Sequence, residues 1–214
     1  MTKKLACLHT SAVHIKTFDD LLRKHNTDIE LVHLVNEDLL EYHQKLGFVD
    51  DKLQTKIELE IAKLAKDSNA ILCTCSSIAQ AAVGLAPKYN LPILRIDKPM
   101  AVKAISLGKR IVVLAALEST LETSLEIVKT TIKENNSDSQ VIAKLCQGAW
   151  QYFEADDYNK YYQTIADCID NLAKNADVIV LAQASMAKAK EFCKADIPVL
   201  SSPELALQAA LKYF

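Results

Sequence analysis

Apolar and polar residues follow one another along the chain in two regular patterns. Short runs of β-branched and aliphatic residues have the length and composition of buried strands, and amphipathic stretches of helix length separate them. The pattern predicts strands at 4–9, 29–34, 70–74, 92–95, 110–115, 139–145, 177–182 and 197–200. It predicts helices at 13–25, 51–67, 77–88, 99–106, 119–135, 157–174, 185–194 and 203–212. This alternation is typical of βαβ units and predicts an α/β fold with largely parallel sheets.

An internal repeat divides this pattern into two halves. Three pairs of segments resemble each other: 3–11 and 109–120, 69–82 and 176–189, and 91–104 and 197–210. All three pairs recur at offsets of 106 to 108 residues, which chance similarity would not produce. We therefore predict two pseudo-symmetric, flavodoxin-like halves related by internal duplication, with an active-site cleft between them. The first half is expected to comprise 1–98 with the C-terminal helix 201–214, and the second 99–200.

Charge and glycine content exclude several classes of partner. The formal net charge of the 214 residues is −2, and lysines mix with acidic residues along the helical stretches. This leaves no basic face for nucleic acid and no polybasic tail for a membrane surface. The apolar runs are far shorter than the roughly 20 residues that span a bilayer, so we expect a cytoplasmic protein. With four glycines there is neither a GxGxxG fingerprint nor a P-loop, which argues against a nucleotide cofactor.

The six cysteines show no disulfide-scaffold spacing, so we expect mostly reduced thiols. The Cys73-x-Cys75 pair lacks the second pair of ligands that a structural zinc site requires, and we predict no metal. A redox pair of Cys73 and Cys75 is a weak alternative, because a disulfide between such close residues on one strand would be strained.

Two polar corners follow equivalent strands of the two halves. In open parallel sheets, ligands lie beyond the carboxyl ends of the strands, where loops lead into helices. Both corners should therefore line one shared cleft, and they contribute Cys75, Ser76 and Ser77 from the first half and Gln183, Ala184 and Ser185 from the second.

The residues around these corners resemble the aspartate/glutamate racemase superfamily. Residues 69–77, a strand followed by Cys75 and two serines, are similar to its first-half motif, and 177–185 are similar to its second-half motif. The segments 95–100 and 201–209 also fit, so the resemblance covers essentially the whole chain. It implies relatives among amino-acid racemases, hydantoin racemases, maleate isomerases and arylmalonate decarboxylases. It further implies a small carboxylic acid substrate, no cofactor and a homodimer.

The sequence departs from the two-base racemases of this superfamily at Gln183, which stands where they carry a second cysteine. Cys75 remains as a candidate catalytic base, and a helix N-terminus should lower its pKa from about 8.5. Gln183 can orient a carboxylate but cannot exchange a proton near neutral pH. One-thiol chemistry stays open: decarboxylation with stereospecific protonation, one-sided proton exchange, or thiolate addition that permits isomerisation. A binding protein that kept the carboxylate cleft and lost catalysis is the main alternative.

Further candidates lie in the loops after the first strand of each half. We expect Thr10 and Ser11, and by resemblance Ser119 and Thr120, to bind the substrate. Ser119 or Thr120 could instead cap a helix, with Glu122 completing a capping box. His9 could be a general acid or a hydrogen-bonded structural residue.

Overall fold

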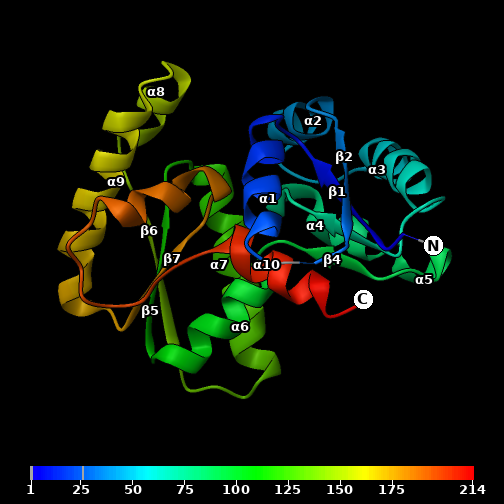
Figure 1. The fold of residues 1–214 in the computed structure, drawn as a ribbon. Coiled ribbons are helices and arrows are strands. Elements are labelled where there is room, and N and C mark those ends of the chain that lie inside the picture. The colour runs from blue at the N-terminus through cyan, green and yellow to red at the C-terminus, as the bar shows by residue number, and fades with distance from the viewer. Residues whose placement is uncertain (1, 26) are drawn as a thin grey trace. The chain divides into compact units, whose positions relative to one another are not determined.

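The protein is described by a computed structural model that covers residues 2–25 and 27–214. Its chain divides into two compact units, one formed by Met1–Ile96 with Pro203–Phe214 and the other by Asp97–Ser202. Each unit is built around a four-stranded parallel sheet with flanking helices, which confirms the predicted α/β fold. The two sheets have the same strand order, β2-β1-β3-β4 in the first and β6-β5-β7-β8 in the second, as expected for a duplicated fold. Figure 1 shows the strands and helices of both units.

The sheet of the first unit places β1 and β3 at its centre. Its strands are β1 (Lys4–His9), β2 (Glu30–Val35), β3 (Ala70–Cys73) and β4 (Ile93–Arg95). Both central strands are buried along almost their whole length, which explains their continuous apolar sequences. Because all four strands run parallel, their carboxyl ends, including His9 and Cys73, lie at the same edge of the sheet.

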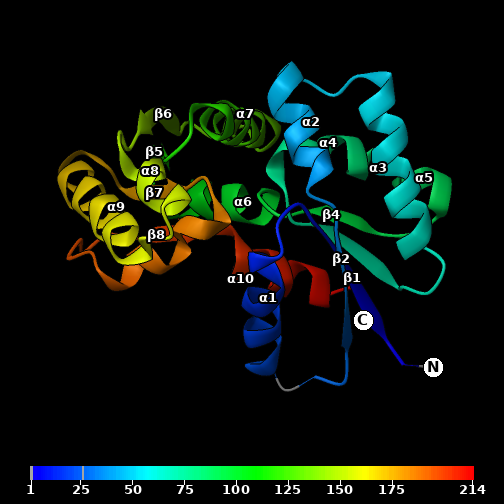
Figure 2. The same ribbon diagram turned by 90° about the horizontal axis from the view of Figure 1, so that it is seen from above.

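Helices cover both faces of this first sheet. The helices are α1 (Val13–Arg23), α2 (Asp38–Leu46), α3 (Asp51–Leu64), α4 (Ser76–Val83), α5 (Ala86–Tyr89) and α10 (Ser202–Leu211). On one face, α2, α3 and α4 pack with the strands into a core that includes Ile57, Ile61 and Ile78, whereas α1 and α10 lie on the other side (Figure 2). Burying each of these isoleucines contributes about 1.5–3 kcal/mol. The Asp50 side chain caps α3 by accepting a 2.7 Å hydrogen bond from the Leu53 N–H.

The second unit repeats the arrangement. Its strands are β5 (Arg110–Ala115), β6 (Gln140–Leu145), β7 (Val178–Leu181) and β8 (Val199–Ser201). Its helices are α6 (Lys98–Leu107), α7 (Glu118–Glu134), α8 (Ala149–Glu154), α9 (Tyr158–Leu172) and the 3₁₀ helices η1 (Ala173–Asn175) and η2 (Ala184–Glu191). One face of the sheet packs against α8, α9 and η2 in a core centred on Tyr161, and α6 and α7 cover the other (Figure 1).

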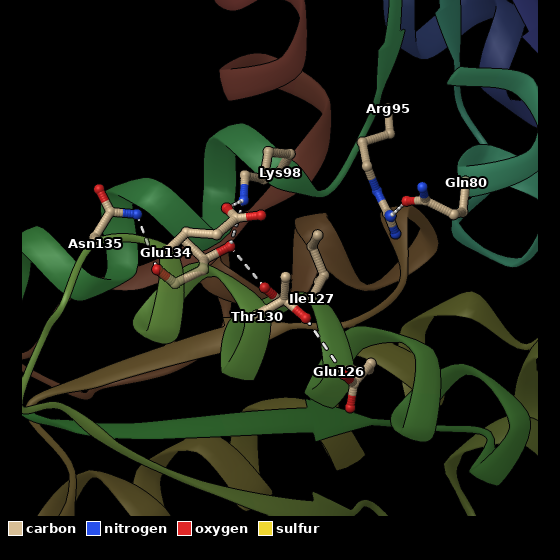
Figure 3. Close-up of polar contacts among 9 residues, drawn as sticks. Gln80, Arg95, Lys98, Glu126, Ile127, Thr130, Glu134 and Asn135 are labelled. Carbon is tan, nitrogen blue, oxygen red and sulfur yellow. Dashed lines mark hydrogen bonds and ion pairs between the residues drawn. The ribbon is translucent and has the colours of Figure 1, made fainter. Parts of the chain in front are cut away.

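Side-chain contacts join neighbouring elements within each unit (Figure 3). In the first unit, Arg95 of β4 donates a 2.8 Å hydrogen bond to Gln80 Oε1 of α4. In the second unit, Lys98 at the start of α6 forms an ion pair with Glu134 at the end of α7. Lys98 also donates a 3.1 Å hydrogen bond to Thr131 Oγ1, so this one side chain ties two helices together.

The eight predicted strands are all present, but the helices differ from prediction in four places. The sequence pattern does not predict α2 or α8, the predicted helix 77–88 is divided into α4 and α5, and the predicted helix 185–194 is the 3₁₀ helix η2. α2 carries ordinary helix-end signals: Asp38 lies in the first turn, and Gly47 ends the helix with a left-handed φ of 80°. Within the described ranges, no helix is long and apolar enough to span a membrane.

Candidate functional site

The first corner places Cys75 at the junction of a buried strand and a helix. β3 ends at Cys73, and Cys75 is the N-cap residue of α4 with extended backbone angles, φ −116° and ψ 115°. Its side chain is buried and the residue is 9% exposed. Cys73 lies deeper in the same core, and its thiol donates a 3.6 Å hydrogen bond to the Cys75 carbonyl.

The surroundings of the Cys75 thiol include several hydrogen-bonding groups. The hydroxyls of Thr10 and Ser77 and the backbone amides of Ser77 and Ile78 interact with the sulfur and favour its ionised form. Burial nevertheless has the larger effect and raises the pKa of Cys75 above its ordinary value. The prediction that the helix N-terminus lowers this pKa is therefore wrong: the helix amides are present, but desolvation outweighs them.

Two other predicted residues of the first unit lie at the same edge of the sheet. Ser76 is the first residue of α4 and is partly buried. Ser11 follows Thr10 in the turn between β1 and α1, and its carbonyl accepts a hydrogen bond from the His14 N–H. The structure thus brings Thr10 and Ser77 to the Cys75 thiol, while the binding roles of Ser11 and Ser76 stay predictions.

His9 is a buried residue at the end of β1 rather than an exposed acid. Its Nδ1 lies 2.8 Å from Thr74 Oγ1, and its Nε2 lies 2.8 Å from His33 Nδ1. Burial, followed by the proximity of His33 and His14, lowers the pKa of His9 to about 3. A neutral imidazole at ordinary pH does not support the general-acid alternative. Among residues 2–25 and 27–214, Cys7, His9 and His33 also have the spacing of metal ligands.

The second corner is built on Gln183, the N-cap residue of η2. Its backbone angles, φ −117° and ψ 138°, are close to those of Cys75, and it is equally buried. Its side-chain Oε1 accepts hydrogen bonds from the backbone amides of Ala116 at 2.7 Å and Leu117 at 3.3 Å. These amides follow β5 and precede α7, so Gln183 satisfies donors that would otherwise be available to an anion.

The other predicted residues of the second unit have different environments. Ala184 is partly buried in η2, and Ser185 Oγ lies 3.0 Å from the Tyr161 hydroxyl. Ser119 and Thr120 lie inside α7, whose N-cap is Leu117, so the alternative that one of them caps this helix in a capping box with Glu122 is wrong. Ser119 is exposed and Thr120 is partly buried. The single cleft shared by the two corners stays a prediction.

Comparisons with known proteins agree with this architecture. The sequence profile of the Asp/Glu/Hydantoin racemase family matches residues 5–210. A search of proteins with curated descriptions found no match.

Several solved structures share the fold. The aspartate racemase of Picrophilus torridus is similar with a TM-score of 0.72 and 16% identity, over 99% of this chain and 94% of that one. The allantoin racemase of Pseudomonas fluorescens has a TM-score of 0.69 and 13% identity, over 98% and 89%. A mutant arylmalonate decarboxylase has a TM-score of 0.60 and 13% identity, over 98% and 92%.

Proposed function

Because the chain belongs to the Asp/Glu/hydantoin racemase family, we propose that it is a cofactor-independent enzyme that acts next to the carboxylate of a small carboxylic acid through the single thiol of Cys75. The observation that carries this proposal is the set of groups around that thiol. The hydroxyls of Thr10 and Ser77 and two first-turn amides of α4 interact with one sulfur atom at the end of a parallel strand.

These donors are of the kind that stabilise an anion formed during a reaction. A carbon next to a carboxylate gives up its proton only if a base lies against it and fixed donors stabilise the resulting enediolate. In one-sided exchange, the Cys75 thiolate takes the proton as the C–H bond breaks, and the electron pair of that bond stays on the carbon and is shared with the carboxylate. The same thiol then returns a proton on the same face.

Gln183 would take the place of a second base. Its Oε1 accepts from Ala116 and Leu117, which fixes the orientation of the side-chain amide. The remaining hydrogen-bonding groups of that amide are the two N–H donors on Nε2, which suit a carboxylate oxygen. Since an amide does not exchange protons near neutral pH, symmetric two-base racemisation is not proposed.

The raised pKa of Cys75 favours a second candidate, a one-cysteine decarboxylase. A thiol that stays protonated at neutral pH is suited to donate a proton. In that reaction the C–C bond to one carboxylate of a disubstituted malonate breaks, CO₂ leaves, and the electron pair remains on the carbon. The Sγ–H bond then breaks, the proton moves to that carbon, and the thiolate recovers a proton from water.

The experiment is a substrate screen with a matched thiol control. Small amino acids, dicarboxylates, hydantoins and arylmalonates are incubated in D₂O, and NMR follows both deuterium incorporation and loss of CO₂. The wild type is compared with Cys75→Ala and with Cys193→Ser, which removes a partly exposed thiol of the second unit. We expect Cys75→Ala to lower turnover by about 10²–10⁴-fold and Cys193→Ser to leave it unchanged.

Two outcomes contradict the proposal. Turnover that survives in Cys75→Ala excludes the thiol as the proton-transferring group. If no compound is turned over but dicarboxylates protect Cys75 from alkylation, the protein binds carboxylates without reacting with them.

A further inference from the structure

Three side chains with metal-binding atoms meet on one face of the first sheet. Cys7 and His9 are two residues apart on β1 and therefore point to the same face. His33 on β2 is the direct register partner of Cys7. The Cys7 sulfur and one ring nitrogen of each histidine all lie within 4.8 Å of one another. Cys7 and His9 are fully buried, and the His9 ring packs against Phe18 of α1.

The outer nitrogens of the two histidines both face oxygen atoms. His33 Nε2 lies 3.1 Å from the Asp19 carboxylate, which can only accept. His9 Nδ1 lies 2.8 Å from Thr74 Oγ1, whose own hydrogen is donated to the Leu8 carbonyl at 3.0 Å. Each outer nitrogen therefore acts as a donor and carries a hydrogen.

This arrangement leaves the two inner nitrogens in an unusual position. With neutral rings, His9 Nε2 and His33 Nδ1 direct their lone pairs at each other across 2.8 Å. Such a contact requires a positive species between the nitrogens, either a proton or a metal ion. A proton would satisfy the two nitrogens alone, and the Asp19 carboxylate would face its charge. A metal ion would bind both nitrogens and also the Cys7 sulfur, which lies within 4.8 Å of a ring nitrogen of each histidine.

We propose that Cys7, His9 and His33 form a binding site for one zinc ion. Thiolate and imidazole are ligands that zinc prefers, and ligating histidines typically donate their other N–H to a carboxylate or another oxygen acceptor. Asp19 and Thr74 already occupy those outer positions. On binding, a Zn–S bond replaces the S–H bond of Cys7, and the thiol proton passes to solvent.

The geometry requires only a small adjustment. Zn–N bonds of about 2.0–2.1 Å in a tetrahedral site place two ligand nitrogens about 3.3 Å apart. The imidazoles therefore have to separate by about half an ångström, and water completes the coordination. Asp19, the partner of His33, also lines a surface hollow of about 500 Å³ together with Leu22, Arg23, Thr27 and Leu31.

The proposed ion would hold together the strand ends that carry the first corner. The Thr10 hydroxyl contacts the Cys75 thiol. His9 directly precedes Thr10 and Thr74 directly precedes Cys75, so both members of this contact adjoin the proposed zinc site. Metal binding can be measured on the protein alone and does not depend on catalysis.

The test uses Co²⁺ as a spectroscopic substitute for zinc on the full chain after treatment with a chelator. We expect one equivalent to bind with a sulfur-to-cobalt charge-transfer band and intense visible bands typical of tetrahedral coordination, and zinc to displace it. Cys7→Ser should remove the charge-transfer band, and His33→Gln should weaken binding by about 100-fold or more. Asp19→Asn, a partly exposed position that leaves the buried ligands in place, should weaken it by about 10-fold or more.

Cys193→Ser and His25→Gln are the matched controls, since each removes a thiol or an imidazole outside the cluster. Both should bind cobalt like the wild type. Absence of stoichiometric binding to the wild type overturns the proposal and means that a proton holds the histidine pair. Binding that Asp19→Asn and Cys7→Ser both retain unchanged overturns it as well.

Discussion

The corner after β3 and the corner after β7 occupy equivalent places in the two units, but their side chains are used differently. Cys75 and Gln183 both precede a helix, have similar extended backbone angles and are equally buried. Each also contacts the segment after the first strand of its own sheet, Thr10 in one unit and Ala116 in the other. The duplicated scaffold therefore preserves the contact while its chemistry has diverged.

The two corners differ in the side chain that accepts from the neighbouring donors. In the first unit, hydroxyls and amides interact with a thiol that can gain or lose a proton. In the second unit, a side-chain amide oxygen satisfies two backbone donors and does not titrate. A pseudo-symmetric fold can thus place a titratable thiol in one half and a structural hydrogen bond in the other while the backbone angles of the two corner residues stay similar.

The largest expected effect is on the rate of racemisation, and it should come from placing a thiol at both corners. Gln183→Cys puts a second thiol beside the amides of Ala116 and Leu117, which would then favour its ionised form. On a substrate identified by the exchange screen, we expect racemisation of one enantiomer to rise by about 10²-fold or more. Chiral chromatography measures it, and Gln183→Ala is the control because it frees the same amides without adding a thiol. Equal racemisation rates in the two variants would refute this expectation.

The next largest effect should be on stability. Gln183→Ala leaves the buried Ala116 N–H without its acceptor, so we expect the free energy of unfolding to fall by about 1–3 kcal/mol. Urea denaturation measures this difference. Gln151→Ala, on α8 and exposed, is the matched control and should change stability little. A Gln183→Ala variant as stable as the control would mean that the amide contact contributes nothing to the second unit.

A smaller effect, on the alkylation rate of Cys75, should follow from removing one hydrogen-bonding group at the first corner. Thr10→Val removes a hydroxyl that favours the Cys75 thiolate while keeping the side-chain shape. We expect alkylation of Cys75 at fixed pH to slow by about 10-fold, which corresponds to roughly 1.4 kcal/mol. Peptide mass spectrometry follows the rate, with the other thiols as internal references. Thr17→Val, on the exposed side of α1, should leave the rate unchanged.

The smallest effect should be a difference in alkaline stability. Burial raises the pKa of Cys75 in the folded chain, so above about pH 9 the unfolded state loses this proton while the folded state keeps it. The stabilising contribution is complete below that pH and is lost as the pH rises, by at most about 1.4 kcal/mol per pH unit. Denaturation of Cys75→Ser between pH 8 and roughly 10.5 should show a shallower loss than the wild type. Parallel curves would contradict the raised pKa.

The sequence was sufficient to predict the strands and the positions of both corners, because buried parallel strands such as β3 and β7 are short continuous apolar runs. It did not predict the hydrogen-bonding state of each corner. Whether the Gln183 amide oxygen meets the Ala116 N–H depends on a side-chain rotamer set by a segment 67 residues away. The pKa of Cys75 likewise depends on how completely α2, α3 and α4 exclude water from it.

The cluster of Cys7, His9 and His33 shows a second reason for incomplete prediction. A short cysteine motif such as Cys73-x-Cys75 is visible in the sequence, whereas Cys7, His9 and His33 come from two strands that only their pairing brings together. Cys7 and His9 have the two-residue spacing of one strand face, but no sequence motif near them identifies His33 as their neighbour. Pairing of β1 with β2 supplies that information.

The division of the chain has a consequence for how the protein is made. The second unit is one continuous segment, Asp97–Ser202, whereas the first unit needs Pro203–Phe214 as well as the residues before Asp97. During synthesis on the ribosome, the second unit can complete its core as soon as its own residues emerge. The first unit, which carries Cys75, is complete only when Pro203–Phe214 have been made. The part of the chain that contains Cys75 is therefore the later of the two to be completed.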